Sequence, residues 1–152
     1  MDLLWPELRV YIVDGSIVNC YNKANISGTT TSGGFSRASG ISGWISSGRI
    51  VNCYNEGNIT SSGAFNRVQN GGIAGLSYGT AKIENCYNLG TISGPGEYVI
   101  NNGGIVGSNG EGSNSATITN SYCTTSSAPY SYYNNMTSEQ SEGRIEAEKL
   151  RT

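Results

Sequence analysis

Asn52-Cys53-Tyr54-Asn55 is the stretch that decides the fold, because the chain repeats it at a nearly fixed spacing. The same four residues begin again at Asn19 and Asn85, and a degraded copy, Asn120-Ser121-Tyr122-Cys123, follows. Successive first asparagines are 33, 33 and 35 residues apart (52 − 19, 85 − 52 and 120 − 85). A period of this length is typical of proteins that stack one structural unit on the next. The repeat therefore predicts the architecture of the chain.

A second repeated element, Gly-Ile-x-Gly, precedes three of these blocks, at residues 40–43, 72–75 and 104–107. The first repeat lacks the glycines but keeps the apolar pattern from Glu7 onward. Each repeat predicts three short strands, namely the glycine element, Ile-x-Asn-Cys-Tyr, and a third segment such as Asn58-Ile59-Thr60. The variable segments that follow, at 28–39, 61–71 and 94–103, are rich in Gly, Ser, Thr and Asn and predict loops.

The alternation within the repeated block indicates which side chains face inward. Ile50, Asn52 and Tyr54 are two residues apart, and the slot between Ile and Asn holds Val18, Val51, Glu84 and Thr119 in the four repeats. A slot that accepts Glu and Thr faces solvent, so the Ile series should lie inside. We expect the Asn slots of the block to form side-chain hydrogen-bonding ladders at or near a bend, and the tyrosines to stack as an internal ladder. These candidate ladder residues are Asn19, Asn52, Asn85, Asn120, Tyr21, Tyr54, Tyr87 and Tyr122.

A repeat of about 33 residues buries its apolar face only by stacking on its neighbours. The sequence therefore predicts an all-β parallel β-solenoid of about four coils over residues 1–133, with repeats at about 7–39, 40–71, 72–103 and 104–133. Residues 134–152 form a separate tail, in which Thr137-Ser138-Glu139-Gln140 matches a helix capping box. We expect a short C-terminal helix that covers the open end of the stack.

Composition excludes several functions. The net charge is −2 and charged residues make up 13% of the chain, so no basic face indicates nucleic acid as a partner. No apolar run approaches the roughly 18 to 20 residues that span a bilayer, so we expect no membrane insertion in this segment. The N-terminus, Met1-Asp2-Leu3-Leu4-Trp5-Pro6, has no signal-peptide pattern. Either the protein is cytoplasmic or a leader lies outside this chain.

The cysteines predict neither a metal site nor a simple disulfide set. Cys20, Cys53 and Cys86 share one repeat slot, whereas Cys123 lies two positions later in its repeat. Three equivalent residues cannot all pair, which favours a ladder of free thiols, although a spacing of about 4.8 Å between neighbouring strands leaves a bridge open. Their facing stays open as well: a bend at Asn turns Cys inward, and a straight strand leaves it outside.

Catalysis is not expected. The chain has no His, which removes His-dependent triads and the His-Glu-x-x-His zinc motif. The acidic residues before the tail fall at unlike repeat positions, so they do not predict paired catalytic carboxylates, and Glu84 with Lys82 is the nearest approach to a charge pair. The glycine-rich stretches precede no helix pattern and so predict no nucleotide site. We therefore expect no enzyme activity, no cofactor and no metal.

Gly-Ile-Ala-Gly at 72–75 and Gly-Ile-Val-Gly at 104–107, each leading to Ile-x-Asn-Cys/Ser-Tyr, resemble GLUG repeats. This family occurs in bacterial surface proteins, adhesin-like proteins and IgA-specific metallopeptidases. The resemblance covers about residues 7–140 and implies secretion or surface attachment, a β-rich stalk or binding region without catalytic residues, and flanking repeats or domains in a longer chain.

Two functions remain open at this stage. The first is a non-enzymatic structural or adhesive segment that contacts a host or cell-surface glycan or protein. The alternative is a carbohydrate-binding or carbohydrate-degrading β-helix whose loops at 28–39 and 61–71 shape a groove. The candidate ligand-binding aromatics are Tyr11, Trp44 and Tyr78, since sugar rings stack on flat apolar faces. The alternative interpretation is that these rings are ordinary, partly exposed aromatics without a role in binding.

Overall fold

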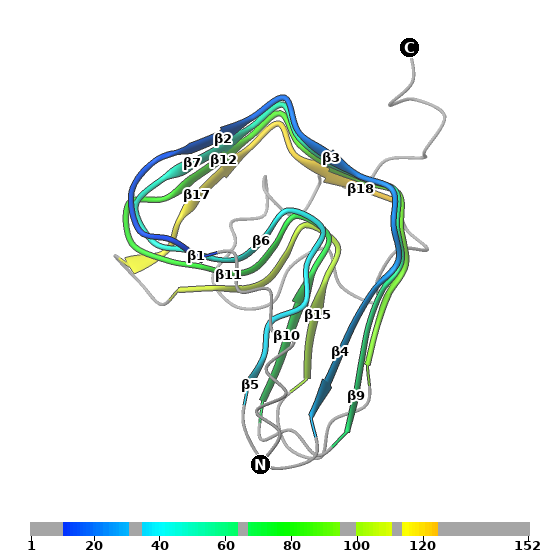
Figure 1. The fold of residues 1–152 in the computed structure, drawn as a ribbon. Coiled ribbons are helices and arrows are strands. Elements are labelled where there is room, and N and C mark those ends of the chain that lie inside the picture. The colour runs from blue at the N-terminus through cyan, green and yellow to red at the C-terminus, as the bar shows by residue number, and fades with distance from the viewer. Residues whose placement is uncertain (1–10, 31–34, 64–66, 95–99, 111–113, 125–152) are drawn as a thin grey trace, which may run out of the picture.

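The computed structural model describes residues 11–30, 35–63, 67–94, 100–110 and 114–124. In these ranges the chain forms eighteen short strands, arranged in five parallel sheets, and no α-helix. The prediction of an all-β parallel solenoid of about four coils is confirmed (Figure 1). The tail at 134–152, with its expected helix, lies outside the described residues, as do residues 1–10.

Each of the first three coils contributes five strands. The first coil contains β1 (Tyr11–Ile12), β2 (Ser16–Val18), β3 (Tyr21–Asn22), β4 (Ile26–Thr30) and β5 (Phe35–Ser36). The second contains β6 (Ser42–Ile45), β7 (Arg49–Val51), β8 (Tyr54–Asn55), β9 (Ile59–Gly63) and β10 (Arg67–Gly71). The third contains β11 (Ala74–Ser77), β12 (Lys82–Glu84), β13 (Tyr87–Asn88), β14 (Ile92–Ser93) and β15 (Ile100–Gly103). The fourth begins with β16 (Val106–Asn109), β17 (Thr117–Thr119) and β18 (Tyr122–Cys123).

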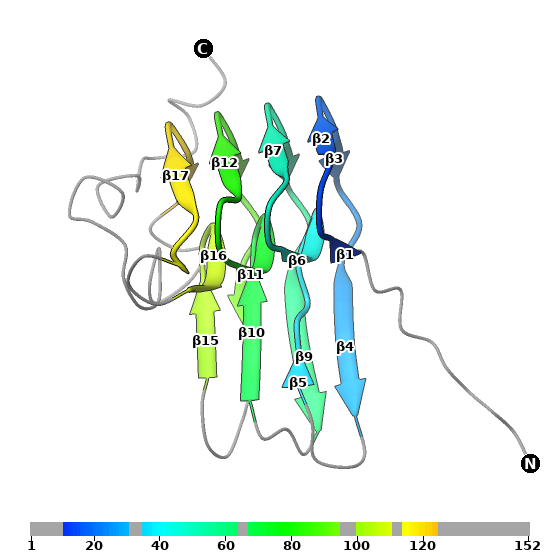
Figure 2. The ribbon, with the colours of Figure 1, turned by 90° about the vertical axis from the view of Figure 1, so that its left-hand side faces the viewer.

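Equivalent positions of successive coils lie directly beside one another. Ile17 pairs with Ile50, Ile50 with Ile83, and Ile83 with Ile118. The strands of each sheet therefore run in coil order, as in β1-β6-β11-β16, and the coils are seen edge-on in Figure 2. This register places Ile50 and Ile83 each between two other isoleucines, which is the expected source of stability in a stacked repeat.

The prediction of three strands per repeat is wrong because the Ile-x-Asn-Cys-Tyr segment is two strands. Asn52 has a φ of 53° and separates β7 from β8. Asn19, Asn85 and Asn120 adopt the same left-handed conformation, with φ values of 56°, 53° and 46°. Asn tolerates this region better than most side chains because it is short and polar. The result is the sharp corner between β2 and β3 at the top of Figure 1.

The predicted loops also contain strands. β5, β10 and β15 form one sheet and β4, β9 and β14 form another, and together they make the lower lobe in Figure 1. Small polar side chains fill part of this lobe. The hydroxyl oxygens of Ser36 and Ser61 lie 3.1 Å apart, and the Ser61 hydroxyl donates to Oδ1 of Asn70 at 2.7 Å. Asn70 donates in turn to Asn102 at 3.0 Å. Polar composition here encodes a hydrogen-bonded interior, and periodicity alone does not reveal it.

The main apolar core lies in the upper lobe. Its largest fully buried side chains include Ile45, Ile50, Ile73 and Ile83. Glycine is required where the backbones of neighbouring coils approach closely: a Cβ on Gly72 would lie 2.2 Å from the Gly104 carbonyl oxygen. The Gly-Ile-x-Gly element therefore packs coils together at their backbones, and its isoleucine occupies the core.

Candidate functional surfaces

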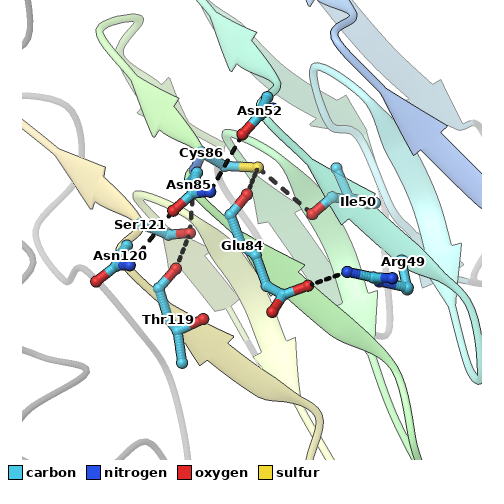
Figure 3. A network of polar contacts seen from close by, with 9 residues as sticks. All are labelled: Arg49, Ile50, Asn52, Glu84, Asn85, Cys86, Thr119, Asn120 and Ser121. Atoms are coloured by element: carbon cyan, nitrogen blue, oxygen red, sulfur yellow. Dashed lines mark hydrogen bonds and ion pairs between the residues drawn. The ribbon is translucent and has the colours of Figure 1, made fainter.

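The Asn at each bend forms an exposed ladder along the stack. Asn52 donates through Nδ2 to Oδ1 of Asn19 at 3.2 Å, and Asn85 donates to Asn52 at 3.2 Å. Asn120 continues the series by donating to Asn85 at 3.3 Å (Figure 3). Both the left-handed backbone and the amide ladder favour Asn, which explains why Asn occupies every corner.

A second ladder, in the last Asn slot of the block and outside the candidate ladder residues named above, lies inside the turn after the tyrosines. Asn22 donates to Oδ1 of Asn55 at 2.7 Å, and Asn55 donates to Oδ1 of Asn88 at 2.6 Å. Asn55 and Asn88 are fully buried, and each also donates to a backbone carbonyl two residues later. The signal for this ladder was the last residue of the repeated Asn-Cys-Tyr-Asn block. These amides hold each turn and join it to the next coil.

The bend settles the facing of the cysteines. Cys53, Cys86 and Cys123 are buried, whereas Cys20 in the first coil is exposed, and none of the four forms a disulfide. Each equivalent thiol lies close to the carbonyl oxygen two residues earlier, at 3.4 Å for Cys20, 3.3 Å for Cys53 and 3.2 Å for Cys86. In the described ranges, no group of three or more Cys, Asp or Glu side chains is placed to hold a metal ion.

Cys53 and Cys86 are neighbours in the thiol ladder and affect one another. The hydrogen bond with Cys53, followed by burial, raises the pKa of the Cys86 thiol. The same hydrogen bond lowers the pKa of Cys53, to about 6. The direction follows from sharing one proton: the sulfur that accepts the hydrogen bond ionises first, and its neighbour then holds its proton more tightly.

The tyrosines stack, but the prediction that they lie inside is wrong. The rings of Tyr21 and Tyr54 are 5.2 Å apart at 11°, and those of Tyr54 and Tyr87 are 4.8 Å apart at 1°. Tyr54, Tyr87 and Tyr122 are half-buried and Tyr21 is exposed. The left-handed bend interrupts the alternation that the prediction assumed, so Cys turns into the core and Tyr turns outward. The outer face of β3, β8 and β13 therefore carries a row of stacked phenols.

Of the three candidate ligand-binding aromatics, the structure brings two together. Tyr11 and Trp44 face each other across β1 and β6, with ring centroids 4.6 Å apart at 88°. The Arg37 guanidinium lies 4.9 Å from the Trp44 ring centroid and donates through Nε to Gln69 at 2.9 Å. Tyr78 lies apart, in the turn after β11. Arg37 thus occupies a face of Trp44 that a sugar ring would need.

The charged side chains join coils. The sequence suggested Lys82 as the nearest charged partner of Glu84. In the described residues Glu84 instead pairs with Arg49 of the preceding coil, which donates to it at 2.9 Å (Figure 3). Lys23 and Glu56 form a second ion pair between coils at 3.4 Å. Each of these two ion pairs contains a single carboxylate, so neither supplies the paired carboxylates of a glycosidase site.

The fold and its ladders define a repeat protein of the parallel β-solenoid class. Residues 71–93, which run from the end of β10 to β14, match the family model described as the GLUG motif. The third coil therefore carries a GLUG motif, and the predicted resemblance is confirmed there. No curated protein and no solved structure matches the chain. Within the described residues, no helix is long and apolar enough to cross a bilayer.

Proposed function

We propose that the chain is a non-enzymatic structural and adhesive repeat segment of a bacterial protein that is secreted or displayed at the cell surface. The observation that carries the proposal is the continuity of the ladders. The bend asparagines, the buried asparagines and the tyrosines each bond or stack on the equivalent residue of the next coil. Such contacts favour a stiff rod, because each coil is fixed by the same set of interactions. The GLUG motif of the third coil supports the extracellular setting.

The adhesive role rests on the outer face. Partly exposed phenols and exposed bend amides recur there once per coil, so the face offers a regular row of hydroxyl and amide groups. Tyr and Asn are effective in recognition since they combine contact area with hydrogen bonding. We propose a host or cell-surface glycan or protein as the partner of this face.

A second candidate is carbohydrate binding at the cluster of Tyr11, Trp44 and Arg37. The observation in its favour is the pairing of two aromatic rings beside a guanidinium and an amide at one corner. Against it, Arg37 covers part of Trp44, and the segments expected to shape a groove form packed sheets in their described parts.

A glycan array probed with the full chain separates the two. The spacer and adhesive proposal expects no glycan binding that depends on Trp44. Strong binding that Trp44→Ala abolishes would overturn it in favour of a carbohydrate site. Tyr78→Ala is the matched control, because Tyr78 is exposed but lies outside the cluster.

A further inference from the structure

The chain contains three Asn-x-Ser/Thr triplets, which is the acceptor sequence for N-glycosylation. Their asparagines are Asn25, Asn58 and Asn135, of which the last lies outside the described residues. The residues two positions before these asparagines are Lys23, Glu56 and Tyr133. Only Asn58 therefore lies in the longer pattern Glu-x-Asn-x-Thr. A carboxylate at this position offers an ion pair to a basic group of a transferase, and bacterial oligosaccharyltransferases select for it.

The triplet at Asn58 presents its polar side chains outward. Asn58 and Thr60 are exposed on either side of Ile59, which is fully buried at the start of β9. Side chains two residues apart in an extended chain share a face. The acceptor amide and the hydroxyl that a transferase reads with it therefore lie on one outer face of the folded chain.

The side-chain amide of Asn58 uses one of its two polar atoms within the stack. Its Oδ1 accepts from the Thr91 backbone N at 2.9 Å and from the Thr91 hydroxyl at 2.8 Å. Its Nδ2 donates to no group in the described coils. N-glycosylation replaces one hydrogen of Nδ2, so the folded chain can carry a glycan there and keep the contact with the next coil.

Asn25 repeats this geometry one coil earlier. Its Oδ1 accepts from the Asn58 backbone N at 2.9 Å, and Asn25 and Ser27 are both exposed. The two triplets differ in the charge that precedes them, and these charges pair, because Lys23 and Glu56 lie 3.4 Å apart. The two side chains are 58% and 30% exposed, so their ion pair contributes little to stability and leaves Glu56 accessible to a second cation.

We propose that Asn58 is an N-glycosylation acceptor and that Glu56 selects it over Asn25. In the reaction, the Asn58 amide nitrogen attacks the anomeric carbon of an oligosaccharide that is carried on a polyprenyl pyrophosphate. A C–N bond forms as the bond from the anomeric carbon to the pyrophosphate oxygen breaks. The pyrophosphate leaves with the electron pair, and the amide nitrogen loses one proton. The proposal rests on the proposed secreted or surface location, because such donors are used on the outer side of the cytoplasmic membrane.

The test incubates the purified, folded full chain with a bacterial oligosaccharyltransferase that requires an acidic residue at this position, and with its polyprenyl-pyrophosphate-linked oligosaccharide. The intact mass should rise by one glycan, and peptide mass mapping should place that glycan on Asn58. Asn58→Gln should abolish the modification, because it removes the acceptor. Glu56→Gln should lose most of it, because the triplet remains and the carboxylate is gone.

The exchange of the two charges is the matched control. Lys23→Glu combined with Glu56→Lys keeps the ion pair between coils and the net charge, and it moves the acidic residue from the second triplet to the first. The glycan should then move from Asn58 to Asn25. Circular dichroism of the unmodified variants establishes that they are folded before the reaction.

A wild-type chain that stays unmodified would overturn the proposal. Equal modification of Asn25 and Asn58, or a glycan that stays on Asn58 after the exchange of charges, would refute selection by Glu56. All components are supplied in vitro, so the result does not depend on export. Fractionation of cells that produce the native chain tests the proposed location separately.

Discussion

Replacing Asn55 by Ala should be among the most damaging substitutions of a polar side chain in the described coils. Asn55 is fully buried, accepts from Asn22 at 2.7 Å, and donates to Asn88 at 2.6 Å and to the Gly57 carbonyl at 2.7 Å. Each hydrogen bond contributes about 1 kcal/mol net, and a buried group left without a partner costs about 1–3 kcal/mol. Losing three bonds and stranding the Gly57 carbonyl gives a destabilisation of roughly 3–5 kcal/mol.

Asn22→Ala is the matched control. Asn22 occupies the same slot in the first coil and makes the same kind of bond to Ala24, at 2.7 Å, but it is only half-buried. Asn22→Ala also removes the donor to the buried Oδ1 of Asn55, but water can reach the half-buried position of Asn22 itself. We therefore expect Asn22→Ala to cost about 2 kcal/mol, less than Asn55→Ala.

The measurement is urea unfolding followed by circular dichroism, with hydrogen exchange to locate the loss. Exchange protection should fall first in the second and third coils, which Asn55 joins. Equal losses of unfolding free energy in Asn55→Ala and Asn22→Ala would refute the reasoning, because burial would then add nothing to the stability that the ladder contributes.

Three further outcomes follow from the same geometry. At Asn85, where φ is 53°, Ala should cost about 1–2 kcal/mol in backbone strain, and Gly should be more stable than Ala in thermal unfolding. Glu84→Gln should change the unfolding free energy by less than about 1 kcal/mol, because its ion pair with Arg49 is partly exposed to solvent, and added salt should reduce the difference. The hydrogen bond with Cys53, together with burial, raises the pKa of Cys86, so its contribution to stability is present below the unfolded thiol value of about 8.5 and is lost as pH rises above it. Urea unfolding across that range should show this fall, and Cys86→Ala should remove it.

The coil, its period and its isoleucine core could be predicted because they depend on local alternation repeated at a fixed distance. Ile50, Ile83 and Ile118 share one slot in the sequence and one column in the structure. Their burial needs no information beyond the repeat itself. The same reasoning identified the third coil as GLUG-like from residues 72–75 and the block that follows.

The facing of Tyr and Cys could not be predicted with equal success, because it depends on one backbone angle. A straight strand through Asn52 places Tyr54 on the side of Ile50, and a left-handed Asn52 places Cys53 there instead. Both conformations are compatible with the same amino-acid sequence. The lower lobe was missed for a different reason: Ser36, Ser61 and Asn70 read as loop residues, yet they satisfy one another inside paired sheets.

The fourth repeat shows what the cysteine slot requires. There Ser121 replaces Cys, and its hydroxyl donates to the Thr119 carbonyl at 2.9 Å, two residues earlier. The thiol of Cys86 makes the same contact with the Glu84 carbonyl at 3.2 Å. The same carbonyls accept a backbone amide from the preceding coil, for example Asn85 N to Thr119 at 3.2 Å. The slot therefore requires a small side chain with a donor that spans the left-handed bend, and sulfur is one of two ways to supply it. A ladder that accepts Ser and Cys alike is explained by support of the corner, so the repeated cysteines do not by themselves indicate metal or redox chemistry.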